Sequence, residues 1–323
     1  MTTTGTLDGV LVVDKPEGMT SHDVVAAVRR RLPRGTRVGH TGTLDPLASG
    51  VLALVIGKAT RLSQFLTAGR KRYNAIVQFG SSTTTDDRAG DVVAIAPTGL
   101  VTALDEGVIR RALATRLGTH PQVPPAHSAK KIGGQRAYEL ARRGGEVDLP
   151  PVSVTAFRLD LTRWDPDAAR AVVELDTSAG YYVRSLAREL GEQVGVPAHL
   201  AALRRTASSE FTLEQSRPLD ELLTVSVEAL TDWCLPLGAL LPSWPAVVLT
   251  EAQQQAAGRG QVVALEPGQD DSDGAEGTRV RLLDQAGTLL AVARLLERPV
   301  PAVHADIVLL PPAPPNALSF GVR

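Results

Sequence analysis

The chain has 323 residues, of which 43% are hydrophobic and 21% charged, and this balance is typical of a globular protein with a sizeable core. No run of about 18 apolar residues is present, so we expect no membrane span, and the opening residues lack the pattern of a signal peptide. The lone cysteine, Cys234, excludes an intramolecular disulfide and is typical of the cytoplasm, where we expect the protein to work.

The net charge of −1 hides an uneven distribution of charge. Residues 1–220 carry 28 basic and 23 acidic side chains, whereas residues 221–323 carry 6 basic and 12 acidic ones. An excess of cations in one part of a chain indicates contact with a polyanion, although charge also fluctuates along any sequence. Both interpretations stay open on charge alone.

The first predicted elements are apolar strands and a helix. Residues 9–18 predict a buried strand that ends in a Pro-Gly turn, and residues 21–32 predict an amphipathic helix with Ser21 as its N-cap. The continuous apolar run 51–57 predicts a second buried strand.

The next predicted segments are a short helix, a strand, a loop and a second helix. A short helix is expected to end at Gly69, and residues 73–80 alternate as a strand does. The polar segment 81–91 lacks periodicity and predicts a loop. Residues 102–118 predict a helix with Thr102 as its N-cap.

The middle of the chain begins with a Pro-rich, basic stretch, 119–134, which we expect to be exposed, followed by a helix over 135–145. Two long strands are predicted over 152–164 and 169–180. The helix predicted over 182–195 has an apolar stripe formed by Val183, Leu186, Ala187, Leu190 and Val194.

The C-terminal part follows a Pro-rich break at 241–246. Residues 278–297 predict a hairpin and 305–310 a further strand, while the acidic segment 266–277 predicts a mobile loop. Strands and helices follow one another without regular βαβ alternation, so the fold class is predicted to be α+β, with a small β-rich domain at the C-terminal end.

Asp45 is the first candidate for chemistry, in the Gly-rich stretch GHTGTLDPLASG before the strand 51–57. An Asp-Pro pair is usually a plain turn. Here His40, Thr41 and Thr43 gather polar groups near the carboxylate, and the following strand offers rigid support. A carboxylate held in a loop at a strand end suits nucleophilic or acid–base work.

Arg184 is the second candidate, in the first turn of the helix 182–195. A cation there opposes the helix dipole, at a cost of about 0.3–1 kcal/mol, unless an anion lies beside it. An arginine that extends into solvent is the alternative. Pairing with Asp45 would keep that carboxylate ionised and orient it.

Basic side chains form three clusters, two of which contain a tyrosine. Cations with interleaved aromatics suit phosphate contact and base stacking, although each cluster could also be a solvated face. The clusters are Lys58, Arg61, Arg70, Lys71, Arg72 with Tyr73; Lys130, Lys131, Arg136, Arg142, Arg143 with Tyr138; and Arg204 with Arg205.

Several familiar motifs fail. GVLALVIGKAT has six residues between its glycines where a P-loop has four, and Ala59 stands where a Mg²⁺-binding hydroxyl is needed. No dinucleotide-binding GxGxxG follows a strand, and the six histidines lack metal-ligand spacing. We therefore expect neither a metal nor a cofactor.

Six blocks of sequence, within residues 8–215, together resemble the TruB family of tRNA pseudouridine synthases in order and spacing. The resemblance implies a pseudouridine synthase fold, with a mixed, largely antiparallel sheet flanked by helices and loops over 8–243, an RNA-gripping insert at about 120–145, and a PUA-like domain over 244–312. The blocks include GVLVVDKPEGMTSHDVV, GHTGTLDPLASGVLALVIGKATRLSQFL, KRYNAIVQFG, TTTDDRAGD, QVPPAHSAKKIGGQRAYELARRG and GYYVRSLARELGEQVGVPAHLAALRR.

The resemblance also implies a reaction, the isomerisation of a uridine in the T loop of tRNA, at position 55, to pseudouridine after base flipping. Asp45 would be the catalytic carboxylate, with Tyr73 stacking on the flipped base and Arg184 pairing with Asp45. The other implied roles are uracil packing for Tyr182 and Leu203, T-loop contact for His40, support of the site for Lys15, and RNA contact for Lys71, Arg72, Lys130 and Arg142.

Three alternatives remain open. The protein could chiefly bind and fold tRNA, with Asp45 as a structural turn. It could be a guide-RNA-dependent synthase of the dyskerin type, against which the basic insert argues. A phosphate-transfer enzyme built on GKAT is disfavoured by the glycine spacing. We expect a monomer that acts on the T arm of tRNA without a guide RNA and without a membrane.

Overall fold

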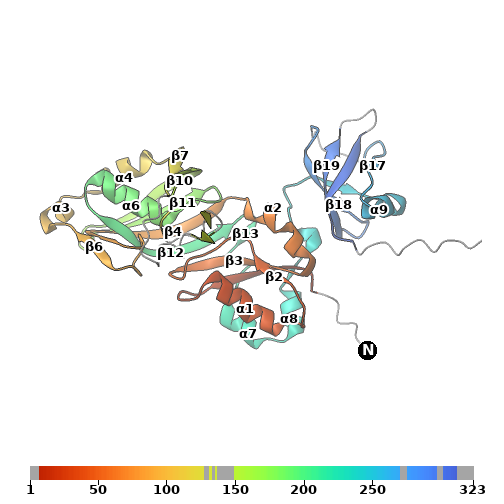
Figure 1. Cartoon of the computed structure of the whole chain (residues 1–323), viewed down its shortest axis with the longest axis horizontal. Helices are drawn as coiled ribbons and strands as arrows, with labels where there is room; N and C mark the ends of the chain where they lie inside the picture. The colour runs from red at the N-terminus through yellow and green to blue at the C-terminus, as the bar shows by residue number, and fades with distance from the viewer. Residues whose placement is uncertain are drawn as a thin grey trace, which may run out of the picture.

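The computed structural model describes residues 7–126, 149–269, 275–296 and 301–310, together with the short strands 131–132 and 135–136. Two separate sheets dominate it (Figure 1): an 11-stranded sheet with helices packed on it, and a five-stranded sheet at one end of the molecule, drawn in blue. Among these residues, no helix has the length and apolar character needed to cross a membrane.

The first sheet has the order β14-β1-β3-β12-β4-β11-β10-β7, and β2, β13 and β15 pair in addition with β3, β12 and β1, respectively. Two of its pairings, β12 with β3 and β1 with β14, are parallel, and the others are antiparallel. The predicted mixed, largely antiparallel α+β sheet is therefore confirmed. Its strands are β1 (Gly9–Lys15), β2 (Val38–His40), β3 (Ala48–Ile56), β4 (Lys71–Phe79), β7 (Gly118–Gln122), β10 (Val152–Asp165), β11 (Arg170–Thr177), β12 (Ala198–Ser208), β13 (Phe211–Thr212), β14 (Arg217–Pro218) and β15 (Leu235–Pro236).

Two segments expected to be irregular contain strands. The polar segment 81–91 begins with β5 (Ser81–Thr83), which pairs with β6 (Val92–Ile95) in a small hairpin. The stretch expected to be exposed from Thr119 starts inside β7, an edge strand of the main sheet that pairs with β10. An edge strand tolerates Pro121 because one side of the strand needs no partner.

Helices α1, α4 and α6 pack against the main sheet (Figure 1). The structure places two predicted N-caps differently. Thr20, not Ser21, caps α1, because Asp23 three residues later completes a reciprocal capping box. Asp105, not Thr102, caps α4. The helices are α1 (Ser21–Arg31), α2 (Ser63–Thr67), α3 (Thr98–Thr102), α4 (Glu106–Ala114), α6 (Val183–Val194), α7 (Leu219–Thr224), α8 (Val227–Asp232) and α9 (Glu251–Gly258), with 3₁₀ turns η1 (Gly57–Leu62) and η2 (Leu237–Ala239).

Helix α6 packs against β12 and β4, so that its N-terminal end lies near the centre of the sheet. Its predicted stripe is buried, except that Val194 in the last turn is half-buried. Gly195 ends the helix in the left-handed conformation, with φ of 71°, which glycine adopts without a Cβ clash. The short helix α2, earlier in the chain, ends at Thr67, two residues before the predicted end at Gly69.

The second sheet has the order β16-β18-β19-β20-β17, and α9 packs against it. The predicted hairpin over 278–297 is formed by β18 and β19, and the predicted strand at 305–310 begins earlier, at Ala302. The strands are β16 (Ala246–Val248), β17 (Val263–Ala264), β18 (Arg279–Leu283), β19 (Leu289–Leu296) and β20 (Ala302–Val308).

Some predicted segments lie largely outside the described residues. Of the helix expected over 135–145, only residues 135–136 are described, and they form β9 (Gln135–Arg136), paired with β8 (Lys131–Ile132). The centre of the predicted acidic loop, residues 270–274, also lies outside the described ranges.

An apolar cluster joins the two sheets. Val10 of β1, Val51 of β3 and Leu66 of α2 are fully buried in the same cluster as Val292 of β19 and Leu309. Arg61 in η1 also donates a hydrogen bond to the carbonyl oxygen of Val308. The second sheet is therefore packed onto the first, and is not only linked to it through the chain.

Candidate active site

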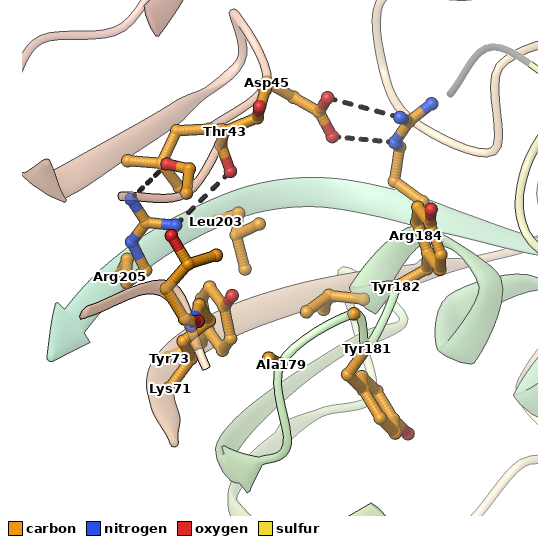
Figure 2. A pocket seen from close by; sticks show the side chains of 15 residues that line it. Thr43, Asp45, Lys71, Tyr73, Ala179, Tyr181, Tyr182, Arg184, Leu203 and Arg205 are labelled. Atoms are coloured by element: carbon orange, nitrogen blue, oxygen red, sulfur yellow. Dashed lines mark hydrogen bonds and ion pairs between the residues drawn. The ribbon is translucent and has the colours of Figure 1, made fainter. Parts of the chain in front are cut away.

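A pocket of about 400 Å³ opens where β4, β12 and the start of α6 meet the loop that contains Asp45 (Figure 2). Its volume is in the range of small-molecule sites. Four segments of sequence that are far apart supply its walls. The lining residues are Gly42, Thr43, Leu44, Asp45, Thr67, Lys71, Tyr73, Ala179, Gly180, Tyr181, Tyr182, Val183, Arg184, Leu203 and Arg205.

The loop around Asp45 is held by hydrogen bonds on both sides of the carboxylate. The buried hydroxyl of Ser21 donates to the carbonyl of Leu44 at 3.0 Å and accepts from its N–H at 2.8 Å. The N–H of Ala48 donates to the carbonyl of Asp45 at 3.0 Å. With its backbone fixed, the Asp45 side chain, 34% exposed, stays at the pocket surface.

Arg205 anchors the same loop from below. Its guanidinium donates to the carbonyl oxygens of Val51 at 2.8 Å, Gly42 at 3.0 Å and Thr43 at 3.3 Å, and the residue is only 1% exposed. Gly50 lets the backbone of Arg205 lie close to β3. A Cβ at this position would lie 2.2 Å from the carbonyl oxygen of Arg205, and the φ of Gly50 is +103°.

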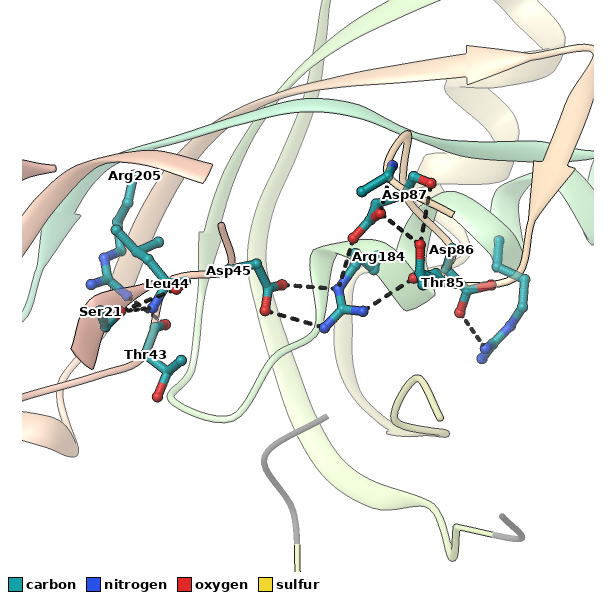
Figure 3. A network of polar contacts seen from close by, with 11 residues as sticks. Ser21, Thr43, Leu44, Asp45, Thr85, Asp86, Asp87, Arg184 and Arg205 are labelled. Carbon is teal, nitrogen blue, oxygen red and sulfur yellow. Dashed lines mark hydrogen bonds and ion pairs between the residues drawn. The ribbon is translucent and has the colours of Figure 1, made fainter. Parts of the chain in front are cut away.

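Arg184 contacts Asp45 through two nitrogens (Figure 3). Nε lies 2.9 Å from Oδ2 and Nη2 lies 3.2 Å from Oδ1, and the arginine side chain is 5% exposed. A two-nitrogen contact fixes the orientation of the carboxylate. The predicted pair is thus present, and the unfavourable position of a cation at a helix start is balanced by an anion.

A second carboxylate, Asp87, lies on the other side of Arg184 (Figure 3). Its Oδ2 is 3.7 Å from Nε of Arg184, while its Oδ1 accepts from the Thr85 hydroxyl at 2.7 Å and from the N–H of Ala89 at 2.9 Å. The carbonyl of Thr85 accepts from Nη1 of Arg184 at 3.1 Å. The hairpin loop after β5 therefore holds the guanidinium in place for Asp45.

Tyr73 and Lys71 reach the pocket from β4 (Figure 2). Burial raises the pKa of the Tyr73 hydroxyl, and the nearby Arg205 only partly opposes this, so the phenol stays neutral near pH 7. Lys71 donates to the carbonyls of Thr67 and Gly69 at 2.8 and 2.9 Å, and burial lowers its pKa to about 8.

Tyr182 and Leu203 also line the pocket, from the start of α6 and from β12. Lys15 does not: it is fully buried beside it, donates to the carbonyls of Pro16 and Met19, and has a pKa that burial lowers to about 8. His40 is half-buried outside the pocket at the end of β2, and burial lowers its pKa.

The remaining predicted contact residues are not in the pocket. Arg72 is exposed and lies on the face of β4 opposite to Tyr73, because neighbouring strand residues alternate. Lys130 and Arg142 lie outside the described residues. Arg204 and Arg205 are not the free cationic cluster that the sequence suggested: Arg204 pairs with Asp14 at 2.7 Å, and Arg205 is buried.

Sequence reasoning missed three contributors to the site. Asp87 lies in the segment predicted to be a plain loop, Arg205 was grouped with surface cations, and Gln122 was not singled out. The side chain of Gln122 bonds both the N–H and the carbonyl of Tyr182. Within the described ranges, no cluster of three or more His, Cys, Asp or Glu side chains could hold a metal ion.

Solved structures with a similar fold contain the protein Cbf5. Cbf5-Nop10-Gar1 matches with a TM-score of 0.70 and 24% identity over 94% of this chain and 86% of that chain. The Nop10-Cbf5 complex of an archaeal box H/ACA sRNP matches with a TM-score of 0.68 and 24% identity over 95% and 87%. At 24% sequence identity, the structural similarity to these proteins establishes the fold alone.

Family models match the chain over most of the first sheet. The model of the TruB family pseudouridylate synthase N-terminal domain matches residues 29–183, and that of the tRNA pseudouridylate synthase B C-terminal domain matches residues 184–241. The fold and the sequence together thus define a pseudouridine synthase, an isomerase.

Curated relatives narrow this class. The tRNA pseudouridine synthase B of Solibacter usitatus is 47% identical over 76% of this chain and 82% of that protein. The protein of the same name from Corynebacterium efficiens is 41% identical over 88% of this chain and 94% of its own length. The chain belongs to the TruB family of pseudouridine synthases.

Proposed function

We propose that this enzyme converts a uridine in the T loop of tRNA, at position 55, to pseudouridine, with Asp45 as the catalytic carboxylate. The observation that carries the proposal is the contact of Asp45 with Arg184 at 2.9 and 3.2 Å at the edge of a pocket of about 400 Å³. The names of the curated relatives support tRNA as the substrate.

A stacked uridine must leave its loop before it reaches the carboxylate. Extrusion of a base costs a few kcal/mol, and stacking on an aromatic ring returns about 1–3 kcal/mol. Tyr73 and Tyr182 offer aromatic rings at the pocket, and Leu203 adds an apolar side chain. These three side chains receive the flipped uracil in the proposed complex.

The reaction replaces the carbon–nitrogen bond between ribose and uracil with a carbon–carbon bond. The bond from C1′ of the ribose to N1 of uracil breaks, the base turns, and C1′ bonds to C5, whose proton is lost while N1 gains one. Asp45 assists the cleavage, by attacking the nucleoside or by supporting departure of the base. Arg184 orients the carboxylate, and the neutral hydroxyl of Tyr73 relays the C5 proton as it leaves. The atoms balance without a cofactor.

A second hollow supports contact with RNA phosphates. It has a volume of about 500 Å³ and lies at the start of β2, the strand that leads to the Asp45 loop. Four cationic side chains line it, and cations placed along a surface position an RNA backbone without reading its sequence. They are Arg34, Arg37, Lys58 and Arg61.

The remaining roles are those that membership of the TruB family implies. His40 contacts the T loop beside the displaced nucleotide, Lys15 supports the Asp45 loop, and Lys71, Arg72, Lys130 and Arg142 contact RNA. The catalytic domain spans 8–243, with the RNA-gripping insert at about 120–145, and the PUA-like domain spans 244–312. The enzyme works as a monomer in the cytoplasm, on the T arm of tRNA and without a guide RNA.

The decisive experiment compares Asp45→Asn with the wild type on unmodified tRNA containing uridine tritiated at C5, with nothing else added. Tritium release should fall by about four orders of magnitude or more, while tRNA affinity is kept. Asp91→Asn, an exposed aspartate of the loop between β5 and β6, is the matched control.

Substantial turnover by Asp45→Asn would overturn the role of the carboxylate. Pseudouridine at another position, found by mapping the product, would overturn the proposed target. Wild-type protein that refolds tRNA but forms no pseudouridine without a guide RNA would overturn the stand-alone activity.

A further inference from the structure

The start of α6 carries three pocket residues, Tyr182, Val183 and Arg184, but has weak helix-start signals. Its N-cap, Tyr182, makes no capping hydrogen bond through its side chain, and the first turn contains no acidic residue. Side-chain caps contribute about 1 kcal/mol, and Arg184 in the first turn opposes the helix dipole. The backbone at Tyr182 therefore depends on contacts from other elements.

Gln122, at the end of β7, supplies such a contact. Its Oε1 accepts from the N–H of Tyr182 at 2.8 Å, and its Nε2 donates to the carbonyl of Tyr182 at 3.1 Å. Gln122 is fully buried, so water does not compete for these bonds. One amide side chain thus fixes both sides of the residue from which α6 starts.

The residue after Gln122 is bound to the same helix. The hydroxyl of Ser185 donates to the carbonyl of Val123 at 2.8 Å, and Nη2 of Arg188 donates to it at 3.1 Å. Arg188 also pairs with Asp86 at 2.8 Å, next to the Asp87 that contacts Arg184. The end of β7, the start of α6 and the loop after β5 form one connected polar network.

We propose that Gln122 is a positioning residue for pseudouridine formation. By fixing the backbone of Tyr182, it directs that side chain to the flipped base and aligns Arg184 with both oxygens of Asp45. The inference rests on the proposed function, because it assigns to Gln122 the alignment of the proposed catalytic pair. A displacement of about 1 Å at a reacting group can cost about 100-fold in rate.

The test replaces Gln122 with methionine, which has similar length but loses both hydrogen bonds. The single-turnover rate constant at saturating tRNA should fall by about 30-fold or more, whereas the dissociation constant for tRNA should change by less than about threefold. Rate and affinity are measured at a temperature at which circular dichroism shows the variant to be fully folded.

Gln78→Met is the matched control. Gln78, in β4, likewise donates to backbone carbonyls, those of Phe79 and Ala168, each at 2.9 Å, but it does not line the pocket. Its replacement should lower stability and leave the single-turnover rate constant within about twofold of the wild type.

A second variant, Gln122→Glu, gives a signature that a purely structural role would not give. The ionised carboxylate accepts from the N–H of Tyr182 but cannot donate to its carbonyl, whereas the protonated acid does both. The rate constant relative to wild type should therefore rise as the pH falls, while that of Gln122→Met stays flat. If Gln122→Met does not fold, Gln122→Glu carries the test alone.

Three outcomes would overturn the inference: a rate constant for Gln122→Met within threefold of the wild type, an equal loss in Gln78→Met, or an effect confined to tRNA affinity. A flat relative pH profile for Gln122→Glu would count against it as well. Failure of the proposed function is recognised separately: by an active Asp45→Asn variant, by pseudouridine at another position, or by wild-type protein that forms no pseudouridine without a guide RNA.

Discussion

The two sheets of the molecule bury different kinds of side chain. Among the described residues, every buried polar or charged side chain lies between Lys15 and Ser208, on or around the first sheet, and the set includes Lys71, Asp87 and Arg205. The core of the second sheet consists of aliphatic side chains alone, from Val247 to Val303 in chain order.

This difference distinguishes the sheet that forms the pocket from the sheet that does not. Burying a charge is unfavourable unless it is paired and hydrogen-bonded, and apolar replacements of buried ion pairs are often neutral or stabilising. A chain selected for stability alone would pack the first sheet as it packs the second. Two of the buried charges instead hold the Asp45 loop: Arg184 contacts the carboxylate, and Arg205 donates to the carbonyls of Gly42 and Thr43.

Among the changes that compare the two sheets, Arg184→Met should have the largest effect. The change leaves Asp45 and Asp87 without the cation that they share, so the single-turnover rate constant should fall by about 1,000-fold or more and the unfolding free energy by about 3–5 kcal/mol. Tritium release and urea unfolding measure the two effects.

The second sheet supplies the control for Arg184→Met. Arg294 pairs with Asp306 at 2.8 Å, but its side chain is 52% exposed, so Arg294→Met should cost less than about 1 kcal/mol and leave the rate unchanged. Equal losses in both variants would show that burial of charge does not distinguish the two sheets.

A smaller loss of activity is expected for Tyr73→Phe. The change keeps the aromatic face for stacking and removes the neutral hydroxyl, so the rate constant should fall by about 100-fold, as for loss of a proton-transfer group, with tRNA affinity kept. A variant that runs at the wild-type rate would restrict Tyr73 to stacking.

Lys71 should give the first sheet a dependence of stability on pH. Its pKa is about 8 in the folded protein, against 10.5 for the free group, so between these values the unfolded chain binds more protons and stability rises with pH. From pH 7 to 9, the unfolding free energy of the wild type should rise by about 1 kcal/mol relative to that of Lys71→Met. Parallel curves for the two proteins would contradict the expected shift.

The smallest effect on catalysis is expected in the second sheet. Leu282→Ala removes a fully buried side chain and should lower the unfolding free energy by about 2–5 kcal/mol. The single-turnover rate constant of the folded variant should nevertheless stay within about twofold of the wild type. A larger fall, measured well below the unfolding temperature, would show that the second sheet helps to shape the pocket.

Local patterns predicted the elements better than their contacts. The apolar stripe of α6 and the strands β1, β3 and β4 follow from hydrophobic periodicity, because each is set by neighbouring residues. The cap of α1 was misplaced by one residue: Ser21 has the right chemistry, but its hydroxyl bonds Leu44, 23 residues away. Such a choice depends on tertiary contacts.

The same limit applies to the site. Asp45 and Arg184 were predictable, because a carboxylate in a Gly-rich turn and a cation at a helix start are each unusual within their own segment. No local pattern marks Gln122 or Asp87. Their partners, Tyr182 and Arg184, lie within about a hundred residues along the chain but on another element. Arg205 looked like a surface cation, because its three carbonyl partners become visible only when β3 and β12 pair.

The apolar cluster shared by the two sheets limits their relative motion. Swivelling the second sheet about residues 241–246 would expose Val10, Val51 and Val292 to water, at about 25 cal/mol for each Å² uncovered. The two sheets therefore keep a constant spacing. A ligand long enough to touch both sheets would therefore meet a surface of fixed dimensions.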